Sequence, residues 1–125
     1  MKNFRFRKFP VYKDGRLFAV EIKALIRKCF PKSETYGLSN QMRRAVDSVV
    51  LNIAEGSDKN TDKEFAKYLN ISRCSLNEVV ACLDVAFDNE YIDQSSLDYY
   101  LEKASLLSNQ ITAFRKSILR SLVKG

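Results

Sequence analysis

Residues 36–56, YGLSNQMRRAVDSVVLNIAEG, decide the fold of this chain. Apolar side chains recur through them mostly at intervals of three and four positions: Leu38, Met42, Ala45, Val46, Val49, Val50 and Ile53. This spacing puts them on one stripe of an α-helix. We expect Ser39 to cap the start of the helix and Gly56 to end it in the left-handed conformation. The stretch therefore predicts one amphipathic helix with a continuous apolar face.

The same helical rhythm recurs in three other segments. They lie at about 15–30, 61–89 and 95 onward. Thr61 and Glu64 stand in the T-x-x-E relation of a capping box, and Ser95 with Asp98 forms a weaker version. Two prolines and four glycines in 125 residues are few, which favours long helices over a many-turned β fold.

The connections between the predicted helices are short, so successive helices are expected to be antiparallel neighbours. The sequence therefore predicts an all-α fold, an antiparallel up-down-up-down four-helix bundle. We assign this bundle to residues 11–125 and expect a basic N-terminal arm at residues 1–10.

A second, polar stripe follows the helix at 39–55. It consists of Gln41, Arg44, Ser48, Asn52 and Glu55. The stripe is either a recognition edge for RNA or protein, or a structural seam of hydrogen bonds between helices or subunits. We favour the seam and expect Asn52 and Glu55 to be shielded and hydrogen-bonded, because unpaired buried polar groups are costly. Glu78 should lie near Gln41 and take a bond from Arg43 or Arg44.

The net charge of +6 is uneven along the chain, because residues 1–37 alone carry +7. A localised basic segment attracts phosphate, and the candidate nucleic-acid contacts are Arg5, Arg7, Lys8 and Arg16. Arginines between aromatic residues also suit backbone contact with base stacking. Two alternatives stay open for this segment: an arm that packs on a neighbouring subunit, and a solvated arm that only aids solubility.

The chain contains no histidine, which removes the usual metal ligand and the usual base for a serine or cysteine nucleophile. It also lacks both glycine-rich nucleotide-binding motifs. We therefore predict no enzyme activity, metal, cofactor or small-molecule substrate. The three cysteines are expected to be reduced and buried. No apolar run approaches the ~20 residues that cross a bilayer, and no signal peptide is evident, so we expect a cytoplasmic protein.

The pattern YGLS-x-Q-x-RRA-x-x-S-x-x-x-NIAEG is followed by Glu64-Phe65 and then by Ser75-Leu76-x-Glu78. This pattern resembles the bacterial four-helix bundle proteins that include those encoded in intervening sequences of 23S ribosomal RNA genes. The resemblance implies a helical bundle assembled into a symmetric homo-oligomer, a pentamer, with no assigned catalytic residues. Related bundle proteins that accompany diversity-generating retroelements are proposed to bind nucleic acid.

The sequence thus leads to one hypothesis and one alternative. The hypothesis is a non-enzymatic homo-oligomer that binds RNA or another nucleic acid through basic surface residues. The alternative is a protein-binding oligomeric scaffold with no nucleic-acid role. The two differ in the salt dependence of RNA binding, because contacts to several phosphates give a steep salt slope.

Overall fold

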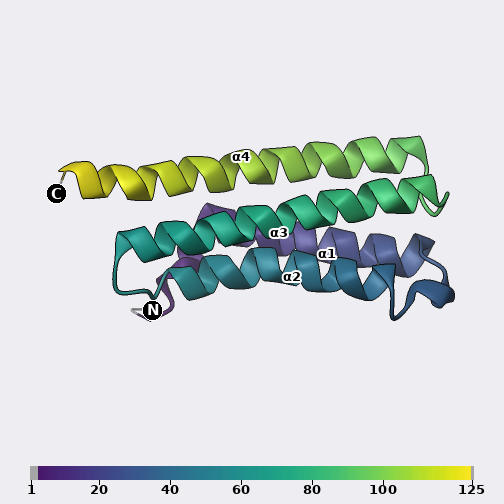
Figure 1. Ribbon diagram of the computed structural model, residues 1–125, viewed down its shortest axis with the longest axis horizontal. Coiled ribbons are helices and arrows are strands. Elements are labelled where there is room, and N and C mark those ends of the chain that lie inside the picture. The colour runs from purple at the N-terminus through teal and green to yellow at the C-terminus, as the bar shows by residue number, and fades with distance from the viewer. Residues whose placement is uncertain (1–2, 125) are drawn as a thin grey trace.

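The protein is all-helical in a computed structural model that describes residues 3–124, with side chains described as far as residue 120. Within residues 3–124 there is no strand. The four α-helices and two short 3₁₀-helices (η) follow one another as η1 Arg5–Lys8, α1 Pro10–Cys29, η2 Lys32–Glu34, α2 Leu38–Gly56, α3 Asp62–Asp88 and α4 Gln94–Lys124 (Figure 1). Residues 1, 2 and 125, at the ends of the predicted arm and bundle, lie outside the described residues.

The four α-helices lie alongside one another, and the chain turns back at each connection (Figure 1). This arrangement is compatible with the up-down-up-down topology. α3 packs extensively against both α2 and α4, whereas α1 has fewer contacts with α2 and α4 and none with α3. The last turns of α4 extend past the connection between α2 and α3 (Figure 1). In the described part of the chain, no helix combines the length and apolar character needed to cross a membrane.

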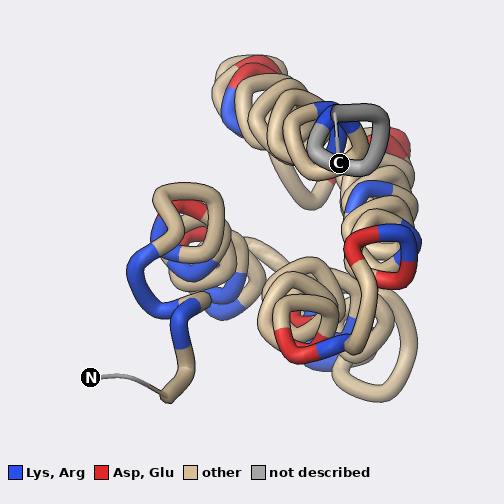
Figure 2. The backbone as a smooth tube through the Cα atoms, turned by 90° about the vertical axis from the view of Figure 1, so that its left-hand side faces the viewer, with Lys and Arg blue, Asp and Glu red and all other residues tan. Residues whose placement is uncertain are grey.

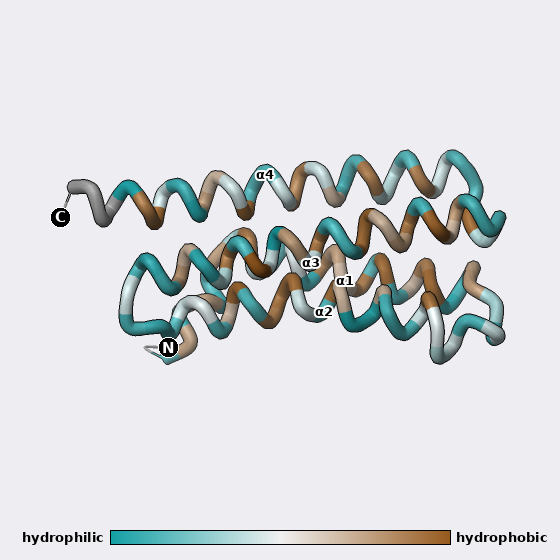
Figure 3. The backbone as a smooth tube through the Cα atoms, viewed as in Figure 1, coloured by the Kyte–Doolittle hydropathy of each residue, from teal (hydrophilic) through white to brown (hydrophobic). Residues whose placement is uncertain are grey.

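The core contains the apolar stripe predicted for α2, all seven residues of which are buried. Figure 3 shows hydrophobic segments recurring along α2. Val49 on α2 is fully buried, and Leu76 on α3 is 2% exposed. A fully buried polar side chain shares this interface: the Ser72 Oγ donates to the Val49 carbonyl at 2.6 Å. Small side chains and a bond to the helix backbone let α2 and α3 approach closely.

Gly56 ends α2 for a different reason from the one predicted. No described glycine has a positive φ, and Gly56 keeps a helical conformation as the last residue of α2. A Cβ atom added there would lie 2.5 Å from Tyr68 Cβ and 3.0 Å from Phe65 Cδ1 on α3. The left-handed cap was therefore wrong, and the glycine is needed because the two helices nearly touch at this point.

The starts of the helices correct three further predictions. α1 begins at Pro10 rather than near Gly15, because proline suits the first turn, where its missing N–H has no helical partner. Ser39 is buried and does not cap α2. α4 begins after Asp93, whose carboxylate accepts the Ser96 N–H at 2.8 Å. The cap of α3 was predicted correctly, since Thr61 Oγ1 accepts the Glu64 N–H at 3.1 Å.

The start of α2 is capped instead by Glu34, one turn upstream. One carboxylate oxygen accepts the Leu38 N–H at 3.0 Å, and the other accepts the Tyr91 hydroxyl at 2.7 Å. These two bonds hold the pKa of Glu34 below its usual range, and the bond from the Leu38 backbone has the larger effect. Glu34 thus connects the α1–α2 and α3–α4 connections at one end of the molecule.

This bridge predicts a pH-dependent contribution to stability. A carboxyl whose pKa is lowered on folding stabilises the fold above its unfolded pKa and loses that contribution as the pH falls through its folded pKa. Glu34→Ala is therefore expected to lower the urea midpoint at pH 7, with a deficit that shrinks in acid. Tyr91→Phe removes one donor and should give a smaller deficit with the same trend. Urea melts between pH 7 and 3 test this, and a deficit independent of pH would contradict it.

Candidate nucleic-acid interface

The N-terminal arm is folded against the bundle instead of forming a tail. Its Arg5 guanidinium donates from Nη2 and Nε to the Ser57 carbonyl at the end of α2, at 2.7 and 3.2 Å. The same guanidinium lies 5.8 Å from the Phe9 ring centroid and 5.5 Å from that of Phe65. Arg5 therefore attaches the arm to α2 and α3, because the C-terminal end of a helix is negative and aromatic faces attract cations.

The other three predicted contacts are more available to a ligand. Arg7 and Lys8 are exposed on η1. Arg16 is exposed on α1, with its guanidinium 5.7 Å from the Tyr12 ring centroid. Arg7 and Lys8 are thus close in sequence and free to meet phosphate, while Arg16 lies about two turns along the next helix.

The fold brings basic residues of α4 to the same end. The Phe114 ring on α4 lies 5.1 Å from that of Phe9 beside the arm. Lys116 and Arg120 follow on α4 and are exposed, while Arg115 Nε donates to the Ala66 carbonyl at 3.1 Å. Figure 2 views this end and shows Lys and Arg on both the arm and α4. Sequence reasoning missed these α4 residues as contacts, because only the tertiary fold joins them to the arm.

Acidic residues limit the extent of this positive surface. Asp58, Asp62 and Glu64 lie on and beside the connection between α2 and α3 at the same end of the bundle. Lys59, Lys63 and Lys67 alternate with these acids, so the connection is close to neutral and the net positive charge of this end lies on the arm and the end of α4. We call Arg7, Lys8, Lys116 and Arg120 the basic end.

The polar stripe of α2 divides into an exposed beginning, a bonded middle and an exposed end. In the middle, Asn52 Nδ2 donates to the Ser48 carbonyl and Oγ at 2.8 and 2.9 Å. The Ser48 and Ser75 hydroxyl oxygens are 2.8 Å apart, which continues the seam to α3. Glu55 is exposed, so its own chain does not give it the shielding we expected.

At the beginning of α2, Gln41 and Arg44 are exposed. They line a shallow groove of about 560 Å³ together with Glu78, as the antiparallel packing of α2 and α3 predicts. Among the described residues, no ion pair joins Glu78 to Arg43 or Arg44, so the expected bond is absent from the single chain. The seam is therefore structural at Ser48 and Asn52 and open to solvent at both ends.

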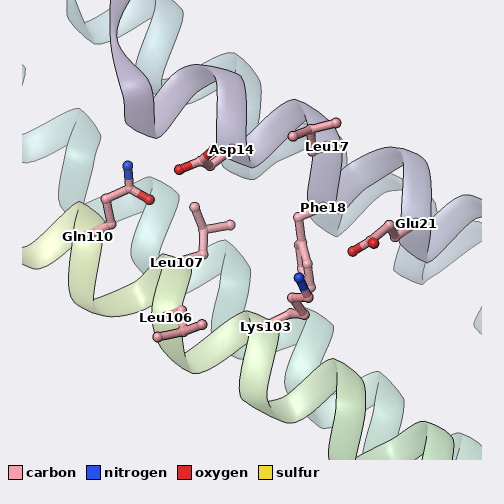
Figure 4. Close-up of a pocket in the computed structure, with 8 residues that line it drawn as sticks. All are labelled: Asp14, Leu17, Phe18, Glu21, Lys103, Leu106, Leu107 and Gln110. Carbon is pink, nitrogen blue, oxygen red and sulfur yellow. The ribbon is translucent and has the colours of Figure 1, made fainter.

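A second groove, of about 310 Å³, lies between α1 and α4 (Figure 4). Asp14 and Glu21 enter it from α1, and Lys103 and Gln110 from α4, around Leu107 and other apolar side chains. These groups contain no nucleophile with an adjacent base, so the groove does not form a recognisable catalytic arrangement.

The cysteines differ from one another in exposure, although all three were expected to be buried. Cys82 is buried, and this burial raises the pKa of its thiol to about 11. Cys29 is half-buried and Cys74 is exposed on α3. All three are free thiols, and within the described residues no group of three His, Cys, Asp or Glu side chains is arranged to hold a metal.

Comparison with known proteins identifies a family and a related fold. The model of the 23S rRNA-intervening sequence protein family matches residues 7–113. A solved structure of a protein of unknown function from the S23 ribosomal protein family of Bacteroides thetaiotaomicron matches with a TM-score of 0.77. The two are 23% identical over 85% of this chain and 98% of that chain, a level at which the likeness concerns the fold alone. No curated protein matches the chain significantly.

Proposed function

The chain belongs to the 23S rRNA-intervening sequence protein family, and we propose that it is a non-enzymatic, homo-oligomeric protein that binds RNA or another nucleic acid. The proposed architecture is an antiparallel up-down-up-down bundle at residues 11–125, with residues 1–10 as a basic arm. The proposed assembly is the homopentamer that the family resemblance implies, in the cytoplasm.

The basic end is the observation that carries the nucleic-acid proposal. Four exposed cationic side chains from two distant segments, Arg7, Lys8, Lys116 and Arg120, lie at the same end of the bundle. Exposed Lys and Arg bind phosphates without reading sequence and speed the encounter with polyanions. Arg5 is left out of this set, because its guanidinium is engaged by Ser57 and two rings.

The test of this proposal is the triple variant Arg7→Gln, Lys8→Gln, Lys116→Gln. We expect the wild type to bind single-stranded RNA weakly in low-salt gel shifts. The triple variant should weaken binding equally for unrelated sequences and reduce the slope of log affinity against log salt by roughly 2, at about 0.7 per lost contact.

A matched triple variant at lysines away from the basic end serves as the control. Lys28→Gln, Lys32→Gln, Lys103→Gln removes the same charge and should leave the salt slope nearly unchanged. Equal effects of the two triples would mean that the basic end has no special role. No RNA binding by the wild type would reject the nucleic-acid proposal and favour the protein-binding scaffold.

The scaffold alternative has an observation of its own. Leu17, Val20 and Leu51 are each more than 60% exposed, which is unusual for large apolar side chains of a monomer. Such a surface is suited to a protein partner, whether or not nucleic acid binds elsewhere.

The proposed homo-oligomer has a direct test in light scattering. One chain has a mass of 14.4 kDa, so a pentamer would have about 72 kDa. We expect a mass several times that of one chain at micromolar concentration. A mass of one chain throughout a dilution series would reject the assembly.

A further inference from the structure

α1 carries an exposed stripe on the side away from the core. It consists of Lys13, Leu17, Val20, Ala24 and Arg27, all of them exposed. The intervals of four and three are those of a helix that packs along another helix. Leu17 and Val20 also line a groove of about 700 Å³ between α1 and α2, with Leu51 on its other side. The stripe has an apolar centre and a basic residue at each end.

α3 carries a second exposed stripe with the same spacing. It consists of Ile71, Cys74, Glu78, Ala81, Val85 and Asp88, all of them exposed. Four of these six side chains are apolar or thiol, and the other two are acidic. The stripe faces away from the core, because the buried face of α3 is formed by other residues, such as Leu76 and Val79.

A single chain cannot bury one stripe on the other. α1 contacts α2 and α4 but not α3, so the two stripes lie on different sides of the bundle. The end-on view in Figure 2 shows the four helices following one another around the molecule. The two stripes can meet only between copies.

We propose that α1 of one copy packs against α3 of the next copy, which makes a head-to-tail interface between identical chains. This inference rests on the homo-oligomer in the proposed function and identifies the surfaces that form it. A head-to-tail contact uses two different patches and closes into a ring when the rotation allows.

Charge selects the head-to-tail pairing over a symmetric one. Residues 74–102 contain seven acidic residues and no Lys or Arg, whereas residues 1–37 carry +7. Two α1 stripes facing each other, or two α3 stripes, would bring like charges together. One of each brings opposite charges together, which favours encounter and fixes the partner.

The internal contacts of one chain set the register of this interface. The rings of Phe9 and Phe65 stack at one end, and those of Phe30 and Tyr91 lie 5.7 Å apart at the other. α1 and α3 therefore run in the same direction and overlap in height, although α3, with 27 residues, is longer than α1, with 20. A closed ring has no rise between subunits, so residues at equal height meet. The Phe9–Phe65 pair gives an offset of 56 positions between the two segments, and the Phe30–Tyr91 pair gives an offset of 61. Leu17 therefore faces residues 73–78 of the next copy, which include Cys74, and Arg27 faces residues 83–88, which end at Asp88.

This register gives a cross-linking test in the whole protein. Leu17→Cys and Lys13→Cys, one turn apart, place a thiol opposite the exposed Cys74 of the neighbour at the two limits of the register. A disulfide forms where the two Cα atoms come within about 7 Å. After mild oxidation we expect a ladder of covalent oligomers on a non-reducing gel, which collapses to one band on reduction. The double variant Leu17→Cys, Cys74→Ser should give no ladder. Leu106→Cys is the matched control, because Leu106 is 59% exposed on α4 and belongs to neither stripe.

A charge exchange tests the same register independently. Arg27→Asp should weaken assembly about tenfold by placing two acids together, and adding Asp88→Arg in the same chain should restore it. An oligomer in light scattering with no ladder from either Leu17→Cys or Lys13→Cys would overturn this interface and leave the proposed homo-oligomer standing. A ladder equally strong in Leu106→Cys would also overturn it. If the protein is a monomer at all concentrations, both the α1–α3 interface and the proposed homo-oligomer are rejected.

Discussion

Replacing Gly56 with alanine is expected to lower the free energy of unfolding by about 3 kcal/mol, because the new methyl group has no space. Its Cβ would lie 2.5 Å from Tyr68 Cβ, an atom fixed to the α3 backbone, so α2 and α3 would have to separate. Urea unfolding followed by circular dichroism measures the loss. The displaced helices also carry the fully buried Ser72 bond, which adds to the cost if it breaks.

Gly15→Ala is the matched control for this prediction. Gly15 lies within α1, and a Cβ there would be 3.6 Å from Val50 Cγ2, an ordinary contact. Alanine loses less backbone entropy than glycine in a helix, so this variant should gain about 0.5–1 kcal/mol. The same substitution is thus expected to have opposite signs at the two sites. A loss of similar size at both would mean that Gly56 is not a contact point.

Leu76→Ala is expected to cost roughly 2–4 kcal/mol. The side chain is 2% exposed in the core between helices, and its removal leaves a cavity that the packed helices cannot fully close. Val49→Ala removes less volume and should cost less. Leu106→Ala, at an exposed leucine, should stay within about 0.5 kcal/mol of the wild type. Urea midpoints of the three variants give the ranking, and near-equal values would show that the buried faces are misassigned.

The helices and their buried faces follow from the sequence because periodicity is a local property. The α2 stripe repeats every three or four residues, so the sequence alone is enough to predict which side chains enter the core. The Thr61 cap of α3 was readable for the same reason, since both of its partners lie within four residues.

Features that depend on contacts with a distant segment of the chain could not be predicted from the sequence. Gly56 fitted a local cap rule, but the actual constraint comes from Tyr68 on the next helix. Arg5 was assigned to phosphate, whereas its partners, Ser57 and Phe65, are distant in sequence. Lys116 joined the candidate site only through the contact of Phe114 with Phe9. Ring and carbonyl partners of this kind leave no periodic signal in the chain.

The sparse packing of α1 has a consequence for how stability depends on the amount of protein. α3 packs more extensively against α2 and α4 than α1 does, so we expect the local opening of α1 to cost less. If its outer stripe is covered by a neighbour, mass action favours the closed form of α1 as concentration rises. Amide protons of α1 should then exchange more slowly in concentrated solution, while those of α3 change little. The next subunit would in this way complete the packing of α1 on its own bundle, and dilution alone would loosen α1.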